Sequence, residues 1–289
     1  MASGLIDEKE VNVKDYLTKS NLPGSDYVIN PYVGCPHGCK YCYARFMKRF
    51  TNHNESWGDF IDIKRCDKPI NIKKLKGKTV FLSSVTDCYN KYEEKYQITR
   101  DILQQLVDSE CILNISTKSS LILRDIDILK KIKHLKVAVS INTLNDELQK
   151  DMDRADCIKS RINALDMLHK NGIYTVLFMS PIMPELTDFK AIIEKTRYFI
   201  DEYWFENLNL RGEYKTDFLK YIDEKYPQYA QTYNEIYILK NNAYWKKMAE
   251  EIETYCEKNS IKHVNFFYHD ELVKEKNRTG QIIKQNSGS

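Results

Sequence analysis

The sequence lacks any run of apolar residues long enough to cross a membrane. Its longest apolar stretch, Tyr174 to Met183, contains Pro181 and is far shorter than the roughly 20 residues that a membrane-spanning helix needs. The stretch MASGLIDEKEVNVKDYLTK at the N-terminus has no apolar core of the kind found in a secretory signal. From these two absences we expect a soluble cytoplasmic protein with no membrane partner.

Internal repeats, low-complexity tracts and a strong excess of one charge are also absent. Lys and Arg number 44 against 41 for Asp and Glu, a net charge of +3. Such a balance neither requires nor excludes a nucleic-acid partner, because binding depends on where the basic residues cluster. The connector 62–78 is locally basic, and we interpret it as a solvated loop-and-helix face, with a polyanion-binding patch as the alternative. Its basic residues are Lys64, Arg65, Lys68, Lys73, Lys74, Lys76 and Lys78.

Short β-rich runs alternate with helical patterns along the first two thirds of the chain. The runs are nearly continuously apolar, which is typical of parallel strands buried on both faces. The predicted strands are Tyr27–Tyr32, Thr79–Ser83, Cys111–Thr117, Leu135–Ile141, Tyr174–Met179 and Phe205–Leu210. The predicted helices lie near 40–50, 97–109, 124–132, 157–171 and 187–201. This alternation predicts an α/β fold with a parallel sheet.

Six such units are two short of a closed eight-stranded barrel, so we predict a partial (β/α)6 TIM-like barrel with a C-terminal helical extension. We divide the chain into an N-terminal extension (1–24), the partial barrel (25–211) and a C-terminal helical or accessory region (212–289). In that region a tyrosine stripe is expected to dock a helix on the barrel, and HVNFFYHDEL is expected to form one more short strand before a frayed end. The stripe consists of Tyr229, Tyr233 and Tyr237.

Three cysteines, Cys35, Cys39 and Cys42, stand within eight positions. Outside a secretory context such a cluster indicates metal or redox chemistry and not disulfides. Structural zinc sites usually pair two such cysteine groups, but the other five cysteines are solitary. His37 is a fourth ligand in principle, although a compact tetrahedral site would be strained by its place between two of the cysteines.

An iron–sulfur cluster of the [4Fe–4S] type normally takes four thiolates. Three thiolates leave one iron open, so we expect a substrate or cofactor to bind there. An electron carrier would gain from a full set of four ligands. A non-catalytic iron–sulfur redox or electron-transfer protein and a zinc-stabilised binding module remain as alternatives.

The spacing C-x3-C-x2-C, with Tyr41 before the last cysteine, resembles the cluster loop of the radical S-adenosylmethionine (SAM) superfamily. Together with SSVTDCYNKYE, ISTKSSLILRDIDIL, VSINTL and SPIMPELTD, it is similar to the spore photoproduct lyase-like branch over about residues 25–211. The later motifs NLNLRGEY and YPQYAQTYNEIY resemble the radical SAM mobile pair protein B subgroup.

This resemblance implies a [4Fe–4S] cluster held by the three cysteines and a bound SAM. It implies cleavage of SAM to a 5′-deoxyadenosyl radical, which abstracts hydrogen from a substrate that the sequence does not identify: a nucleic acid, or a peptide or small molecule. The cofactor would carry the hard chemistry and the protein would supply placement. The implied partners are an external one-electron reductant of the flavodoxin or ferredoxin kind and, from the second resemblance, a second radical SAM protein.

The resemblance also assigns single residues. It places Tyr41 near the adenine and Lys118 and Ser140 beside SAM, and Ser84 and Asp87 join them as expected cofactor-binding residues. Each has a simpler interpretation as well, because strand-end residues on this face of a barrel also cap turns, pack loops or lie exposed. Two further residues that fit the family pattern are Glu93 and Arg124.

Two departures from the branch bear on the chemistry. Ser84 stands where the lyase has its hydrogen-donating cysteine, whereas the partner tyrosine is present as Tyr43. A serine O–H bond is too strong to quench a carbon radical, so dimer repair by the same relay is not expected. Cys88 could replace the donor, or it is an inert packed thiol. The second departure is Asn90-Lys91, where relatives often have Gln-Pro, and it leaves the loop less stiff.

Overall fold

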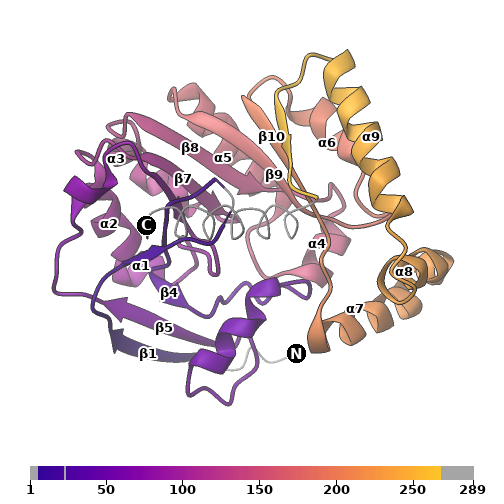
Figure 1. The fold of residues 1–289 in the computed structure, drawn as a ribbon, viewed down its shortest axis with the longest axis horizontal. Coiled ribbons are helices and arrows are strands. Elements are labelled where there is room, and N and C mark those ends of the chain that lie inside the picture. The colour runs from indigo at the N-terminus through magenta and orange to yellow at the C-terminus, as the bar shows by residue number, and fades with distance from the viewer. Residues whose placement is uncertain (1–5, 23, 268–289) are drawn as a thin grey trace, which may run out of the picture.

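A computed structural model describes residues 6–22 and 24–267. Its main feature is an eight-stranded sheet in the order β11-β10-β9-β8-β7-β6-β3-β2, in which only the β2–β3 pair is antiparallel among the described strands. The strands are β2 (Leu17–Lys19), β3 (Tyr27–Ile29), β6 (Thr79–Leu82), β7 (Ile112–Thr117), β8 (His134–Ser140), β9 (Tyr174–Ile182), β10 (Glu202–Asn207) and β11 (His263–Asn265). The sheet is curved and open, which confirms the α/β partial-barrel prediction; the described strands form no closed barrel (Figure 1).

The six predicted strands appear as β3 and β6 to β10, and two edge strands extend them. Most apolar side chains of the central strands are buried, as expected for strands covered on both faces, although Ile112 at the start of β7 is 41% exposed. β11 confirms the expected last short strand, although the rest of HVNFFYHDEL from residue 268 and the predicted frayed end lie outside the described residues.

A second, three-stranded sheet was not predicted. It has the order β1-β5-β4, from β1 (Asp7–Asn12), β5 (Phe60–Arg65) and β4 (Tyr32–Val33), and lies below the main sheet in Figure 1. The predicted strand Tyr27–Tyr32 was therefore wrong as one element. The chain leaves the main sheet at Pro31, because proline has no N–H with which to continue the ladder.

The helices follow the predicted pattern with shorter bounds. The first expected helix is the 3₁₀ helix η1, and the one near 124–132 is split into η3 and α3. The helical elements are η1 (Tyr43–Phe50), η2 (Ile72–Leu75), α1 (Glu93–Tyr96), α2 (Ile98–Leu106), η3 (Ser120–Asp125), α3 (Ile126–Leu129), α4 (Asp146–Met152), α5 (Ile158–Lys170), α6 (Phe189–Thr196), α7 (Gly212–Lys225), η4 (Pro227–Tyr229), α8 (Ala230–Tyr237) and α9 (Ala243–Lys258).

The tyrosine stripe docks α8 on the barrel, as predicted. Tyr233 and Tyr237 are buried, and their hydroxyls donate to the backbone carbonyls of Pro184 (3.0 Å) and Leu208 (2.8 Å). Tyr229 lies one element earlier, in η4, and stacks on Tyr226. The C-terminal helices α7 to α9 gather at one side of the sheet (Figure 1).

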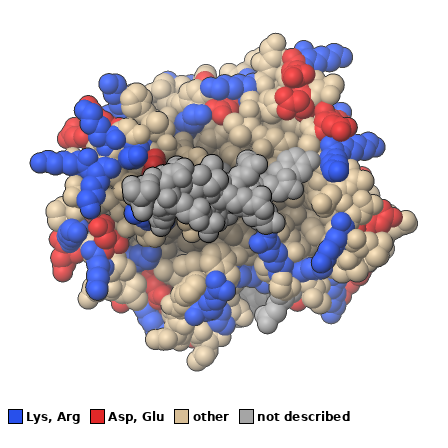
Figure 2. All heavy atoms as spheres, in the orientation of Figure 1, with Lys and Arg blue, Asp and Glu red and all other residues tan. Residues whose placement is uncertain are grey.

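The basic connector 62–78 is partly strand, so its interpretation as loop and helix throughout was wrong. Lys64 and Arg65 belong to β5. Several of its cations meet carboxylates: Arg65 with Glu10 (3.0 Å), Lys76 with Glu110 (2.6 Å), Lys78 with Asp26 (3.6 Å) and Lys68 with Asp15 (3.7 Å). Figure 2 shows Lys and Arg spread around the periphery of one face, with Asp and Glu between them. These pairings favour a solvated face over a polyanion patch.

In the part of the chain that the structure describes, none of the helices has the length and apolar character that crossing a bilayer requires.

Candidate active site

The parallel strands end at one edge of the sheet, and the predicted site residues gather there. Leu82 pairs with Ile115, and Thr117 pairs with Val139. The segments that follow β6, β7 and β8 therefore emerge side by side, and they carry Ser84, Asp87 and Lys118. The loop with the three cysteines follows β4 and reaches the same edge through its contacts with these segments.

The cysteine loop is held by backbone contacts to the segment after α4. The amide of Lys40 donates to the carbonyl of Met152 (2.9 Å), and the amide of Arg154 donates to that of His37 (2.8 Å). Gly38 has φ +54°, and a Cβ there would come within 2.4 Å of the Arg154 guanidinium. The positive φ favours glycine here, because residues with a Cβ rarely adopt that backbone conformation.

The three thiols form a donor set at the site, with Cys35 and Cys39 buried and Cys42 partly buried. Burial, followed by the charge of Asp87 and then by the other two cysteines, raises the pKa of the Cys35 thiol well above its ordinary value. Burial also raises the pKa of Cys39 and of Cys42, while the Lys118 cation acts in the opposite direction on both. Deprotonated thiolates are the ligands of iron–sulfur clusters, so three neighbouring thiols, two of them near the Lys118 cation, fit such a group.

Trp57 adds a further indication of fit. Its indole nitrogen is buried without a hydrogen-bond acceptor in the described structure. The same N–H lies close enough to the Cys42 thiol to lower the pKa of that group against the effect of burial. An indole N–H is a donor only, so a sulfur carrying negative charge would satisfy it where a thiol does not.

Lys118 and Tyr41 lie together beside the thiols. The Lys118 ammonium lies 5.8 Å from the centre of the Tyr41 ring. The Tyr41 side chain is buried, and its hydroxyl donates to Oδ2 of Asp153 (3.1 Å). Tyr41 is therefore fixed by Asp153, and Lys118 is the cation that faces the cysteine loop.

Asp153 is the centre of a buried network that joins the cysteine loop to β8. Its Oδ1 accepts from Arg161 (2.6 Å) and from Gln149 (2.8 Å), and both side chains of the ion pair are 1% exposed. Arg161 also donates to the backbone carbonyl of Ser140 (3.3 Å). The end of β8, with Ser140, is thereby tied to the position of Tyr41.

Asp87 links the cysteine loop to the end of β7. It accepts from the hydroxyl of Thr117 (2.7 Å) and the amide of Lys118 (2.7 Å). Nδ1 of His37 lies 3.4 Å from Asp87, and burial lowers the pKa of His37 despite the nearby carboxylate. His37 is thus engaged with Asp87 through Nδ1.

Glu93 and Arg124, which fit the family pattern, form a buried ionic network. Glu93 is fully buried and accepts from Tyr32 (2.5 Å) and Arg124 (2.7 Å). Arg124 also donates to Asp125 (2.8 Å), which in turn accepts from Arg100 (2.6 Å). The network fastens α1 to η3. The carboxylates of Glu93 and Asp125 accept hydrogen bonds from other residues of the protein.

Ser84, Tyr43 and Cys88 lie around the loop after β6. The Tyr43 hydroxyl donates to the Ser84 carbonyl, and the Ser84 hydroxyl accepts from Asn30 (2.9 Å). Burial raises the pKa of the Tyr43 hydroxyl, although the residue as a whole is 48% exposed. Cys88 is fully buried in the main hydrophobic core, which favours the packing interpretation of its thiol.

A pocket of about 450 Å³ lies on the outer side of the cysteine loop. His37, Ser120, Arg154 and Asp156 are among its lining residues, and the three cysteines are not. It therefore adjoins the candidate site without containing the metal ligands.

Sequence reasoning missed several residues of the site. Asp153, Arg161 and Gln149 come from α4, α5 and the segment between them, and Trp57 from the segment before β5. Local sequence signals do not mark these positions, since each matters through a partner that is distant along the chain. A weak signal was available in Arg161, an arginine on the side of α5 that carries the buried Leu165 and Leu168.

Comparisons with known proteins agree with the site. A family model described as the Radical SAM superfamily matches residues 29–195. The chain is 36% identical over 254 residues to the uncharacterized protein MJ0683 of Methanocaldococcus jannaschii, covering 87% of this chain and 94% of that protein. It is 25% identical over 228 residues to the uncharacterized protein Rv2578c of Mycobacterium tuberculosis, covering 73% and 67%.

Two solved structures share the fold at low identity. Spore photoproduct lyase complexed with dinucleoside spore photoproduct has a TM-score of 0.55 and 14% identity, covering 76% of this chain and 66% of the lyase. SuiB of Streptococcus suis bound to SAM has a TM-score of 0.52 and 13% identity, covering 85% of this chain and 51% of SuiB. With the family model spanning more than half of its length, the chain belongs to the radical SAM superfamily.

Proposed function

We propose that this protein is an enzyme in which Cys35, Cys39 and Cys42 hold a [4Fe–4S] cluster that serves the reductive cleavage of SAM. The observation that carries the proposal is the loop of three closely spaced thiols at the carboxyl edge of the sheet, with Cys35 and Cys39 buried, Cys42 partly buried, and the Lys118 cation near Cys39 and Cys42. When bound, the cluster and SAM supply the 5′-deoxyadenosyl radical that abstracts hydrogen from a substrate.

The roles of the protein's own residues follow from their contacts. The Lys118 ammonium is placed to attract a carboxylate such as that of SAM, while Asp87 holds the Lys118 backbone by accepting from its amide (2.7 Å). Tyr41 and Ser140 are held in place through Asp153 and Arg161. We propose that these two residues contact the adenosyl part of SAM, as the family resemblance implies.

We propose a peptide or small molecule as the substrate class. The neighbouring SuiB has been solved bound to a precursor peptide, at a TM-score of 0.53 and 16% identity. This chain has Ser84 where the lyase-like branch has its donor thiol, and the cations of its basic connector are largely paired with carboxylates. Nucleic acid is the second candidate, because spore photoproduct lyase has been solved with a dinucleoside photoproduct.

An external one-electron reductant of the flavodoxin or ferredoxin kind is the partner that this chemistry requires. The resemblance to the mobile pair subgroup adds a second radical SAM protein as a proposed partner. The division of the chain into an N-terminal extension (1–24), a partial barrel (25–211) and a C-terminal region (212–289) also stays a prediction.

The test is anaerobic reconstitution followed by reduction with dithionite in the presence of SAM. We expect about four irons per chain and slow release of 5′-deoxyadenosine without substrate. Replacing the three loop cysteines together by alanine should abolish both, whereas Cys66→Ala, outside the loop, should change neither. Zinc without iron would overturn the proposal, and iron without SAM cleavage would leave the non-catalytic redox protein.

The substrate class needs a separate experiment. Binding of duplex and single-stranded DNA should be weak and should not depend on Lys73 and Lys74, whose replacement by glutamine removes two connector charges. A steep salt dependence that flattens in that double variant would instead favour nucleic acid.

A further inference from the structure

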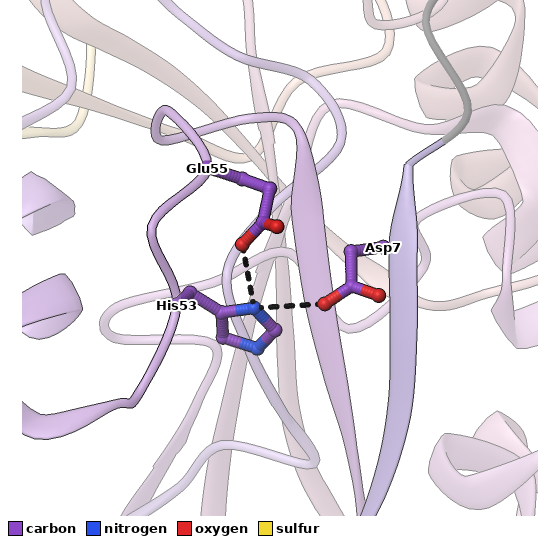
Figure 3. Close-up of side chains that lie close together, drawn as sticks. All are labelled: Asp7, His53 and Glu55. Carbon is purple, nitrogen blue, oxygen red and sulfur yellow. Dashed lines mark hydrogen bonds and ion pairs between the residues drawn. The ribbon is translucent and has the colours of Figure 1, made fainter.

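Away from the cysteine loop, the buried imidazole of His53 faces carboxylate oxygens with both ring nitrogens. Its Nε2 lies 2.7 Å from Oδ1 of Asp62. Its Nδ1 lies 3.1 Å from Oδ2 of Asp7 and 3.1 Å from Oε2 of Glu55 (Figure 3). The His53 side chain is 2% exposed and stacks on Phe60 with ring centroids 4.1 Å apart.

A neutral imidazole does not satisfy this arrangement. It has one N–H and one lone pair, and ionised carboxylates only accept hydrogen bonds. With the N–H of Nε2 donated to the nearest carboxylate, that of Asp62, the lone pair of Nδ1 points at Asp7 and Glu55. A positive charge is required near Nδ1. Lys9 supplies one to Asp7 (2.7 Å), and the charge that faces Glu55 is supplied by a proton on Nδ1 or by a metal ion that binds both carboxylates.

The surroundings of Asp7 favour the metal ion. Oδ2 of Asp7 is shielded from solvent and has ion-pair contacts with Lys9 (2.7 Å) and with Nδ1 of His53 (3.1 Å). A proton on Nδ1 would be donated to Oε2 of Glu55, which has hydrogen-bond geometry to it, and would leave Asp7 to Lys9, whereas one metal ion would bind both carboxylates. The three ligand atoms all lie within 4.8 Å of one another, so one ion can reach all of them.

We propose that Asp7 Oδ2, His53 Nδ1 and Glu55 Oε2 bind a divalent transition-metal cation. One imidazole with two carboxylates is a ligand set that suits Mn²⁺, Fe²⁺ and Zn²⁺. Asp62 would act as the usual carboxylate partner of a metal-binding histidine, accepting the other ring N–H and fixing the ring. Glu55 is 40% exposed on its side chain, which opens the remaining coordination positions to water.

Lys9 is the group that competes with such an ion. Its ammonium lies on the same oxygen of Asp7 that the metal would use. The Lys9 side chain is 53% exposed and has no buried contact that holds it there, so it can swing into solvent when a cation enters.

The site would fasten three segments that lie behind the cysteine loop. Asp7 is on β1, Asp62 is on β5, and His53 and Glu55 are on the segment that leads from η1 to β5. Trp57 and Phe60, from the same stretch, pack with Cys35 in one apolar cluster. The ion would therefore stabilise the segment that backs the first cluster cysteine, and this inference does not rest on the proposed SAM chemistry.

The experiment is titration of the full-length protein with Mn²⁺, after removal of adventitious metal, with loss of the EPR signal of free Mn²⁺ as the readout. Mn²⁺ suits oxygen and nitrogen ligands and avoids thiolates. We expect one high-affinity Mn²⁺ per chain and a rise in the melting temperature when it binds. His53→Gln and Glu55→Gln should each weaken binding at least tenfold, and Asp62→Asn about 10–100-fold.

Two further variants sharpen the result. Lys9→Met should tighten binding, because it removes the competing cation. Glu10→Gln removes a carboxylate from the same strand, where it pairs with Arg65, and should leave binding unchanged. Failure of both the wild type and Lys9→Met to bind Mn²⁺ would overturn the proposal in favour of a protonated His53. Wild-type affinity in Glu55→Gln, an exposed change that should not unfold the chain, would overturn it equally.

Discussion

The hydroxyl of Tyr43 donates a hydrogen bond to the backbone carbonyl of Ser84, and so joins the helix after the cysteine loop to the segment after β6. These are the two positions at which the family resemblance implies a tyrosine and a hydrogen-donating cysteine. The tyrosine is present and the thiol is replaced by a hydroxyl. A hydroxyl at this position does not donate hydrogen as the implied thiol would, so we propose that the radical reaction ends in a different way.

Tyr43→Phe removes this hydrogen bond. We expect a loss of about 1 kcal/mol of unfolding free energy, with unchanged iron content and unchanged 5′-deoxyadenosine release in the absence of substrate. With substrate present, a role in radical quenching predicts less product for each 5′-deoxyadenosine formed, measured by chromatography of both. Tyr198→Phe, at a side chain that is 84% exposed, is the control. An unchanged ratio in Tyr43→Phe would limit Tyr43 to holding the loop.

Lys118→Ala should weaken SAM binding without loss of iron. A charge-assisted contact is worth roughly 1.5–3 kcal/mol, or about tenfold to a hundredfold in affinity. Equilibrium binding to the reconstituted protein measures the effect, and Ser140→Ala should act in the same direction. Lys130→Ala removes a cation that bonds Asn171 instead and should have no effect. SAM affinity equal to that of the wild type in both site variants would show that neither residue contacts SAM.

Breaking the buried pair Asp153–Arg161 should destabilise the protein and make its stability less dependent on pH in the acid range. Burial alone raises the pKa of Asp153, but the charges of Arg161 and Lys118 outweigh it, so the pKa lies below its ordinary value. Such a carboxyl contributes stability above its unfolded pKa of about 3.9 and loses that contribution as the pH falls through the lower folded pKa. The free energy of unfolding of the wild type should therefore fall below about pH 4. That of Asp153→Asn should fall less over the same pH range.

Urea unfolding at a series of pH values tests this prediction. Asp153→Asn leaves the Arg161 charge buried without its partner, which typically costs about 3–5 kcal/mol near neutral pH. The exposed pair of Asp166 and Lys170 (2.6 Å) on α5 offers a matched control, since Asp166→Asn should cost less than about 1 kcal/mol. Equal losses from the two variants would contradict the importance given to the buried network.

Cys88→Ala should behave as a core substitution. The thiol is fully buried and burial raises its pKa well above the ordinary value, so we expect a loss of about 1 kcal/mol in stability. Release of 5′-deoxyadenosine should be normal. Cys111→Ala, which also removes a buried thiol of the main core, should cost a similar amount. Product lost or diverted by Cys88→Ala but not by Cys111→Ala would make Cys88 a hydrogen donor after all.

The sequence by itself determined the elements that local pattern specifies. Continuous apolar runs placed the six central strands, since each run must be buried whatever its neighbours are. The spacing of Cys35, Cys39 and Cys42 predicted a three-thiolate site, because residues within eight positions of one loop stay near one another. The tyrosine stripe likewise predicted a docked helix through its helical period.

Tertiary structure alone decided the contacts between distant segments. β1 lies beside β5, which brings Asp7 next to His53, and α4 lies against the cysteine loop, which brings Asp153 to Tyr41. Single aspartates and histidines carry no local signal of such partners. Whether such residues come into contact depends on the register of the sheet and on the exit of the chain at Pro31 into the second sheet. A shift of one residue in a strand would turn Asp7 to the opposite face.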